Sequence, residues 1–221
     1  MQRSRRAWPP LPQPLRPTAQ PAPGAGSGGR GCRSGRPRGA AALGRGVKVA
    51  YQGAPGAFGH QAALSFCPGC DLAPLDTFED VARAVASGDA ERGVLPVENS
   101  RAGPVDGVAE LIATSGVRVV EERALPVRMH LLALPGVAIE DVKLVRSHPV
   151  ALLQCAEKVA ALGLEAEPAA NTAVAARDLA TRDRAVLASE AAATAYGLSI
   201  LVADMQDDPD NATRFAVIAR K

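Results

Sequence analysis

The sequence predicts an α/β fold of two small lobes, with mainly parallel sheets and a cleft between the lobes. From residue 47 onward, short apolar runs typical of buried strands alternate with segments of helical periodicity, which is the pattern of layered α/β proteins. The alternation occurs in two successive blocks, and this indicates two lobes rather than one. The stretch of about 175 residues is long enough for both.

The individual elements follow from these patterns in chain order. Apolar runs of strand length, bounded by turn residues, predict strands at 47–53, 92–100, 117–127, 128–134, 143–149, 185–189 and 213–219. Helical spacing of apolar residues predicts helices at 57–66, 78–88, 105–116, 150–163, 172–183 and 190–198. In the last predicted strand, Phe215 and Val217 form the buried face. Thr213 and Arg214 are therefore expected at the beginning of that strand.

Residues 1–46 differ in composition from everything that follows. They hold nine arginines, no acidic residue, 8 of the 18 prolines and 9 of the 21 glycines. Such a segment buries too little apolar surface to offset its ordering entropy, so a disordered leader is predicted. Three origins are open: an organelle transit peptide, a basic disordered arm, or upstream sequence foreign to the native protein. The arginine-rich, acid-free composition favours a transit peptide that is absent from the mature protein.

The charge of the body limits its partners. The nine arginines of the leader leave 16 of the 25 basic residues against 23 acidic ones, so residues 47–221 carry about −7. Nucleic acid is therefore not expected as the main partner, because phosphate neutralisation needs a basic face. No apolar run reaches the length of about 18 residues that spans a bilayer, so no membrane partner is expected.

The metal and redox candidates are weak. Cys67 and Cys70 form a single C-x-x-C in "CPGC", without the second pair that a zinc site needs. A thioredoxin-type pair opens a helix, whereas this one follows a helical stretch at a Pro-Gly turn, so an ordinary turn with reduced thiols is predicted. His60, His130 and His148 have no neighbours at ligand spacing, and no metal is expected.

Polar residues follow several predicted strands, at the positions where open α/β sheets bind their ligands. Besides the glycine turn "GAPGAFGH", they are Glu98, Asn99 and Ser100 in "PVENS", Ser147 in "SHP" and Thr172 in "NTA". Helix capping alone would explain Ser147 or Thr172. Together, the helix N-termini and short polar side chains predict a site for a small anion.

The body of the chain carries a series of motifs in a fixed order: "VAYQGAPGAFGHQAA", "VLPVENSRAGPV", "ALPVRMHLLALPGV", "SHPVALLQC", "NTAVAA", "ASEAAATAYGL" and "DDPDNATRFAVI". Its end has an aromatic residue, spaced aliphatic residues, an acid and then Thr-Arg-Phe, at Tyr196, Leu198, Leu201, Asp207, Thr213, Arg214 and Phe215. In these motifs residues 47–220 resemble the catalytic domain of prephenate dehydratase and of its plant and algal relative, arogenate dehydratase. The resemblance implies an architecture similar to that of type 2 periplasmic binding proteins.

The chain departs from the family pattern at three positions. Gly59 stands where the family usually has Ser, Val150 where it commonly has Gln, and Ala216 where it has a larger aliphatic residue. None of the three touches the Thr-Arg-Phe triplet. The phenylalanine-sensing ACT domain that usually follows the triplet is missing from this sequence. The expectation is either a protein without that regulation or a fragment.

The resemblance implies a lyase of phenylalanine biosynthesis that converts prephenate to phenylpyruvate with loss of water and CO2. Arogenate, which would give phenylalanine directly, is the alternative substrate. Thr213 is the implied catalytic residue, as a hydrogen-bond donor beside the departing hydroxyl. Glu98 is either a carboxyl acid of the mechanism or part of a turn. Arg214 suits either a substrate carboxylate or a structural acid such as Asp207.

The other residues assigned to the substrate site by the resemblance are Asn99, Ser100, Ser147, Thr172 and Phe215. Neutral donors and helix dipoles bind a carboxylate without a strong ion pair, so the ring carboxylate stays able to leave as CO2. No cofactor is implied, because the reaction needs neither redox chemistry nor metal polarisation. The implied partners are the small-molecule substrate and a second copy of the chain in a homodimer.

Location and rival functions follow from the same observations. The protein is expected in the plastid if the leader is a transit peptide, and in the cytoplasm otherwise. One rival is a non-catalytic two-lobed module that binds small anions, because the fold by itself does not separate binding from catalysis. Another is an inactive relative. The intact Thr-Arg-Phe triplet and "PVENS" favour the enzyme.

Overall fold

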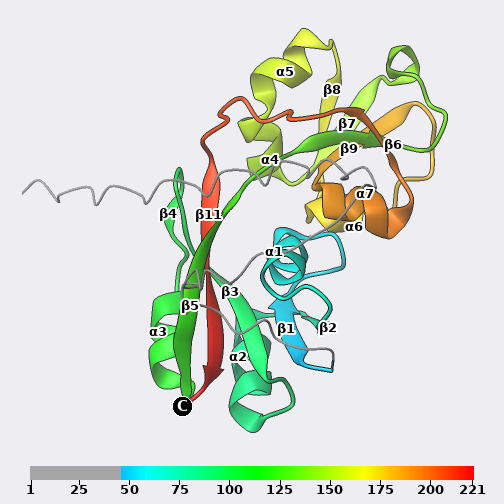
Figure 1. The fold of residues 1–221 in the computed structure, drawn as a ribbon. Helices are drawn as coiled ribbons and strands as arrows, with labels where there is room; N and C mark the ends of the chain where they lie inside the picture. Colours follow the sequence, from blue (N-terminus) through cyan, green and yellow to red (C-terminus); the bar gives the residue numbers. More distant parts are fainter. Residues whose placement is uncertain (1–45) are drawn as a thin grey trace, which may run out of the picture. The chain divides into compact units, whose positions relative to one another are not determined.

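The computed structural model describes residues 46–221, which fold around two β-sheets (Figure 1). The predicted leader lies outside the described residues, apart from Gly46. Each sheet packs helices against both of its faces, which confirms the predicted α/β class. We call the first sheet with α1 to α3 the first lobe, and the second sheet with α4 to α7 the second lobe.

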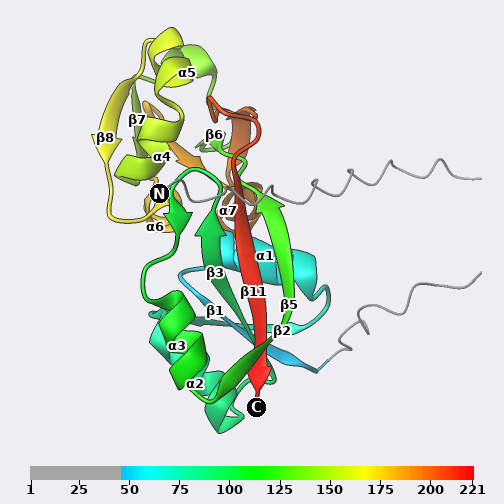
Figure 2. The same cartoon turned by 90° about the vertical axis from the view of Figure 1, so that its left-hand side faces the viewer.

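The first sheet combines strands from both ends of the described chain. Its order is β2 (Asp71–Leu75), β1 (Lys48–Gln52), β3 (Arg92–Asn99), β11 (Ala212–Arg220) and β5 (Val117–Pro126), with β4 (Gly103–Pro104) paired to β3. β1 is parallel to β2 and β3, whereas β11 is antiparallel to both β3 and β5. The last strand therefore lies between two strands of the first half (Figure 2).

Helices cover both faces of the first sheet. α1 (Phe58–Phe66) packs on one face, in a cluster that includes Phe215. α2 (Phe78–Ser87) and α3 (Val108–Thr114) pack on the other face, in a cluster that includes Ala216. Successive side chains of a strand point to opposite faces, so β11 contributes to both clusters.

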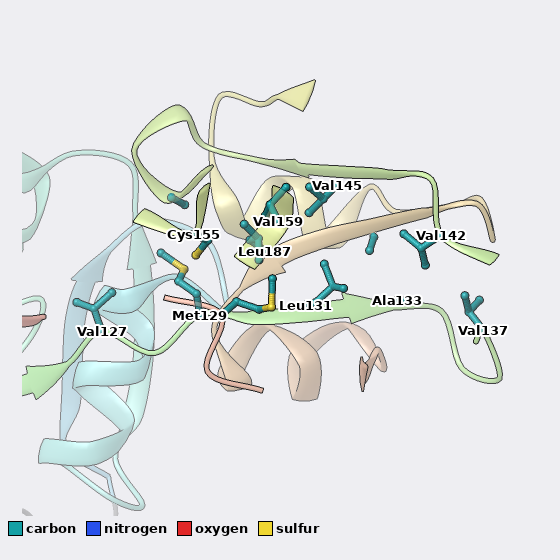
Figure 3. Packing of buried hydrophobic residues seen from close by; sticks show 13 residues of the cluster. Val127, Met129, Leu131, Ala133, Val137, Val142, Val145, Cys155, Val159 and Leu187 are labelled. Carbon is teal, nitrogen blue, oxygen red and sulfur yellow. The ribbon is translucent and has the colours of Figure 1, made fainter. Parts of the chain in front are cut away.

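The second sheet has the order β10 (Ser199–Val202), β6 (His130–Ala133), β9 (Arg184–Ala188), β7 (Leu144–Ser147) and β8 (Glu165–Pro168). α4 (Pro149–Gln154) and α5 (Ala156–Ala161) pack on one face, and a 3₁₀ helix, η1 (Ile139–Asp141), precedes β7. α6 (Thr172–Arg177) and α7 (Glu190–Tyr196) pack on the other. The buried side chains Leu131, Val145 and Leu187 gather in the cluster under α4 and α5 (Figure 3).

Capping residues explain where several helices begin and end. Side-chain oxygens of Thr77, Asn171 and Ser189 accept backbone N–H groups from the first turns of α2, α6 and α7. α2 and α7 end at Gly88 and Gly197, which have the left-handed backbone conformation that glycine adopts without strain. The glycine and cap pattern of the sequence thus agrees with the helix boundaries.

The prediction of mainly parallel sheets is wrong, because both sheets are mixed. In the first sheet β11 enters in the direction opposite to β3 and β5, since it returns from the second lobe that β5 leads into. In the second sheet β6 is antiparallel to β9 and β10. Only the pairs of β1 and of β7 are parallel.

Four strands, namely β2, the two-residue β4, β8 and β10, and one helix break were missed. β2, β8 and β10 are edge strands, and edge strands need no continuous apolar run because one side stays unpaired. β2 also contains Pro74, which an edge strand tolerates. The helix predicted at 150–163 is two helices, because Cys155 has non-helical dihedral angles between α4 and α5. None of the helices among residues 46–221 is both long and apolar enough to cross a membrane.

Candidate active site

The residues Asn99 and Thr213 face each other where β3 ends and β11 begins. The Asn99 amide nitrogen Nδ2 donates a hydrogen bond to Thr213 Oγ1 at 3.0 Å. The Asn99 oxygen Oδ1 accepts the backbone N–H groups of Arg101 and Ala102, at 2.9 and 3.0 Å. Because these two donors require the oxygen, the nitrogen must be the atom that faces Thr213.

Asn211 holds this pair from the segment that leads into β11. Its side chain is only 2% exposed, and its Oδ1 accepts from Asn99 Nδ2 at 3.0 Å and from Ser100 Oγ at 3.4 Å. Ser100 Oγ in turn accepts the backbone N–H of Ala212 at 3.0 Å. Asn99, Ser100, Asn211 and Thr213 therefore form one connected hydrogen-bond network.

Asn211 is the site residue that reading the sequence missed. It lies in a turn-like run, "DDPDN", where an asparagine is explained by local turn formation alone. The available signal was its place two residues before Thr213, on the same side of an extended chain.

The network sets the direction of the Thr213 hydroxyl. Thr213 Oγ1 accepts the Asn99 amide proton, and among the described residues no acceptor receives the hydroxyl's own proton. A hydroxyl that accepts from a donor-only group keeps its proton available for another partner. Thr213 is thus arranged as a hydrogen-bond donor, and the donated bond from Asn99 makes the hydroxyl more acidic.

Arg214 lies on the opposite face of the first sheet from Thr213. Its cross-strand partners are Glu98 on β3, with a short ion pair, and Glu122 on β5, at 2.5 Å. Burial lowers the pKa of the Arg214 guanidinium, but the hydrogen bonds to Glu98 and Glu122 outweigh burial and raise that pKa above its ordinary value. Asp207 is not its partner, because Asp207 accepts backbone N–H groups at the start of α5.

The ion-pair cluster of Arg214 spans three neighbouring strands because β11 lies between β3 and β5, and β3 has a bulge beside it. Arg214 pairs in register with Glu98 and Phe215 with Pro96, so Val97 has no partner on β11. A β-bulge of this kind bends its strand and changes the direction of the side chains that follow. Here it precedes the two residues that meet Arg214 and Thr213.

Ser147 and Phe215 are not brought to the Asn99–Thr213 network. Ser147 is fully buried at the end of β7, and its Oγ donates to the carbonyl oxygen of Leu187 at 2.7 Å. Phe215 is 2% exposed and packs edge-on against Phe66 in the core under α1, with ring centroids 6.2 Å apart. Both placements give these side chains a role in holding the fold.

Thr172 is the first residue of α6 and is half-buried. Asn171 caps that helix, since its Oδ1 accepts the N–H of Ala173 at 2.8 Å. Within the described part of the chain the Thr172 hydroxyl makes no hydrogen bond. Asn171 is therefore the residue that caps α6, and the Thr172 hydroxyl is not used by the described residues.

The glycine turn "GAPGAFGH" is a contact between the lobes. The carbonyl oxygen of Gly56 accepts from Ser189 Oγ at 2.6 Å, and Tyr196 Oη donates to the carbonyl oxygen of Pro55 at 2.6 Å. A Cβ atom on Gly56 would lie 2.6 Å from Ala192 Cα. One on Gly59 would lie 2.7 Å from the carbonyl oxygen of Gln52, so the turn as folded here requires glycine at both positions.

Beside this contact a groove of about 530 Å³ lies between α1 of the first lobe and α7 of the second. Its polar lining is His60, Gln61, Ser65, Glu190 and Thr194. None of the site residues predicted from the sequence lines this groove.

The three histidines are tied to the backbone. Nδ1 of His60, His130 and His148 accepts the N–H of Gly56, Asp204 and Val150, at 3.0, 3.2 and 3.2 Å. Burial lowers the pKa of both His60 and His130, which keeps these rings neutral. Within residues 46–221 no histidine is hydrogen-bonded to a serine or threonine side chain, so the arrangement of a histidine-activated hydroxyl nucleophile is not formed there.

Comparison with known proteins places the chain in a family. The chain is 43% identical over 178 residues to arogenate dehydratase/prephenate dehydratase 2, chloroplastic, of Arabidopsis thaliana, covering 79% of the chain and 47% of the relative. It is 44% identical over 180 residues to arogenate dehydratase 1 of Petunia hybrida, covering 79% and 42%. The chain therefore spans about half the length of the curated relatives that it matches.

Solved structures give the same fold. The prephenate dehydratase of Arthrobacter aurescens in complex with L-Phe is 28% identical, with a TM-score of 0.72 over 79% of this chain and 61% of that one. GqqA, described as a novel type of quorum quenching acylases, is 34% identical, with a TM-score of 0.74 over 79% and 64%. A family model described as "Prephenate dehydratase" matches residues 49–221, and the chain belongs to that family.

Proposed function

We propose that this protein catalyses the decarboxylating dehydration of prephenate to phenylpyruvate, with arogenate, which would give phenylalanine, as the alternative substrate. Family membership supports the reaction class. The relatives named above carry arogenate dehydratase in their names, which supports the alternative. The observation that carries the proposal is the hydrogen bond from Asn99 Nδ2 to Thr213 Oγ1.

The reaction needs stabilisation at one breaking bond, the bond between the ring carbon and its hydroxyl oxygen. The bond between the ring carbon and its carboxylate breaks, its electron pair enters the ring, and the ring hydroxyl leaves as the ring becomes aromatic. The oxygen gains negative charge as it leaves, so a donor placed beside it stabilises the transition state more than the ground state. Thr213 is proposed as that donor, because its hydroxyl proton is not used within the described residues.

Asn99 is proposed to set the direction and strength of this donor. The Asn99 amide cannot accept a proton from Thr213, so it leaves the hydroxyl proton directed toward the substrate. Its bond also stabilises negative charge on Thr213 Oγ1 as the proton moves toward the leaving oxygen. A preorganised amide of this kind supplies stabilisation without reorganisation during the reaction.

The proposed substrate contacts are neutral donors. Thr172 is proposed to bind a substrate carboxylate through its hydroxyl, because that hydroxyl makes no hydrogen bond among the described residues. Asn99 and Ser100 are proposed to line the site, with their own donor hydrogens directed to Asn211 and Thr213. Ser147 and Phe215 are proposed to support the site from within the two cores. Glu98 is proposed as a partner of Arg214 rather than as the acid, because it is engaged in the ion pair.

Location and assembly are part of the proposal. A plastid location is supported by relatives that carry chloroplastic in their names and by the composition of residues 1–46. A homodimer is proposed from the family alone.

Acyl hydrolysis is the second candidate, because GqqA is described as an acylase. A serine or cysteine acylase needs a nucleophile beside a base, and the three histidines have Nδ1 occupied by backbone groups. We therefore place it below the dehydratase.

The test is to incubate the full chain separately with prephenate, arogenate and an N-acyl amide. Formation of phenylpyruvate or phenylalanine is expected, and the ratio of the two kcat/KM values names the preferred substrate. Release of the acyl group, with neither aromatic product, would replace the proposal by the second candidate. Absence of all three products from a folded chain would overturn both.

A further inference from the structure

The segment Cys67–Cys70, which ends α1, has the geometry of a tight turn. The backbone N–H of Cys70 donates to the carbonyl oxygen of Cys67 at 3.3 Å, and Gly69 has a φ of 84°. Proline at the second position, glycine with positive φ at the third and a hydrogen bond from fourth to first residue describe a type II β-turn. The sequence "CPGC" thus matches the turn's requirements at every position.

This turn places the two cysteines within disulfide range. The ends of a β-turn lie less than about 7 Å apart between Cα atoms, and disulfides join Cα atoms about 4.4 to 6.8 Å apart. The two side chains are close enough to hydrogen-bond to each other. Both thiols are reduced in the structure.

The two thiols differ in access. Cys67 is 3% exposed and belongs to the core cluster under α1, whereas Cys70 is partly exposed. Burial, followed by the neighbouring Cys70, raises the pKa of the Cys67 thiol to about 11. Cys70 is therefore the thiol that an external reagent meets first, and Cys67 is the protected partner.

We propose that Cys67 and Cys70 form a reversible disulfide by exchange with an external disulfide of the glutathione class. The Cys70 thiolate attacks one sulfur of the external disulfide, forms a mixed disulfide and releases the first thiol. Cys67 then loses its proton to solvent, attacks Cys70 Sγ and expels the second thiol. One external disulfide is reduced to two thiols, and two protein thiols become one disulfide.

The raised pKa of the Cys67 thiol predicts how readily this disulfide forms and is reduced. A thiol with a high pKa is a poor leaving group, so reduction that expels Cys67 is slow. The same thiol is rarely ionised at neutral pH, so closure depends on its fixed proximity to Cys70. The sequence alone predicts a turn whose thiols stay reduced. The structure points to a disulfide instead, because the turn geometry holds the two thiols close together.

Oxidation at this turn acts on the core behind the candidate active site. Cys67 shares a buried cluster with Tyr51, Val94 and Phe215. Phe66, the residue before Cys67, packs edge-on against Phe215, which is two residues from Thr213. The disulfide fixes the Cys67 side chain toward Cys70 and so changes the packing of this cluster.

The test uses the full chain with Cys32→Ser, because Cys32 lies outside the described residues. The folded protein is treated with oxidised glutathione, remaining thiols are alkylated, and peptides are weighed by mass spectrometry. The peptide with Cys67 and Cys70 is expected to lose two hydrogens and to resist alkylation, and a dithiol reductant should reverse both changes. Recovery of both cysteines alkylated, or of a glutathione adduct that never closes, would overturn the proposal.

Single variants separate the steps. In Cys67→Ser, Cys70 is expected to stop at the glutathione adduct, and in Cys70→Ser, the buried Cys67 is expected to stay unmodified. Cys155 is fully buried and is the internal control that should stay reduced throughout.

Gly69→Ala tests the turn itself. A Cβ at Gly69 would have no atom within 4 Å, so this variant acts only through the positive φ, which L-residues rarely adopt. Disulfide closure is expected to slow by about tenfold, because the strained turn is populated less. Closure at an unchanged rate would show that the turn does not bring the thiols together.

Discussion

The Asn99 amide nitrogen lies 3.0 Å from Thr213 Oγ1, and the register of β3 and β11 places the two residues directly opposite each other. Two backbone N–H groups hold the Asn99 oxygen on the other side of the amide. The direction of the Thr213 hydroxyl is therefore decided by a neighbour that is 114 residues away in the sequence.

The first prediction concerns the Thr213 hydroxyl. Thr213→Ala is expected to lower kcat for prephenate or arogenate by at least about 10²-fold, the scale of one positioned catalytic donor. Thr213→Ser, which keeps a hydroxyl, should retain more activity than Thr213→Ala. Circular dichroism and thermal unfolding check that both variants fold, and turnover of Thr213→Ala at the normal rate would refute the assignment.

The second prediction concerns the orientation of that hydroxyl. Asn99→Asp keeps an oxygen for the two backbone donors but turns the atom facing Thr213 into an acceptor, so the hydroxyl proton is drawn away from the substrate. A fall in kcat of about 10²-fold is expected at neutral pH. Activity should recover partly as pH falls toward about 4, where an aspartate protonates. A flat pH profile at full activity would contradict the proposed direction of the hydroxyl.

The third prediction separates the two suggested roles of Arg214. Its partners Glu98 and Glu122 lie across the strands, and the three side chains are 31 to 41% exposed, so solvent screens the pairs. Arg214→Gln should lower the free energy of unfolding by about 1 kcal/mol, and KM should change little, because Arg214 pairs with structural acids on the face opposite Thr213. Arg118→Gln, on the exposed side of β5, is the matched control and should change neither. A large rise in KM with unchanged stability would assign Arg214 to substrate binding instead.

The fourth prediction concerns the contact between the lobes. Gly56 and Gly103 have nearly the same positive φ, 88° and 83°, but only a Cβ on Gly56 would meet another backbone, at Ala192. Gly103→Ala should cost about 1 kcal/mol through backbone strain alone. Gly56→Ala should cost about 2 kcal/mol or more, because steric overlap with α7 adds to the same strain. Equal losses in chemical denaturation would mean that the contact with α7 yields without cost.

The fifth prediction is a pH dependence of stability. Burial lowers the pKa of His60 and His130 in the folded chain relative to the unfolded value of about 6.5. Below that value the unfolded state binds more protons than the folded state, so the free energy of unfolding falls as pH is lowered through about 6.5. Denaturant titrations between about pH 5 and 8 measure this slope. Replacing both histidines by glutamine should flatten it, and an unchanged slope would assign the dependence to other groups.

Much of the site was predictable because its residues lie at strand boundaries that the sequence pattern marks. Asn99, Ser100 and Thr213 stand at the ends of apolar runs, where strand boundaries can be recognised before the fold is known. Asn211 was not predicted, since its role depends on meeting Asn99 across two strands. Ser147 and Phe215 were placed in the ligand site, but their burial depends on packing that no local pattern reveals.

The sequence alone determined the α/β class, most of the helices and inner strands, and the family motifs, because these follow from local periodicity, capping and turn chemistry. The tertiary structure decided strand direction, since pairing of β11 with β3 and β5 depends on where the chain returns from the second lobe. The tertiary structure also decided which partners the side chains on each face of the sheet meet. Thr213 and Arg214 are adjacent in sequence but lie on opposite faces, because successive side chains of a strand alternate, and each face has its own partners.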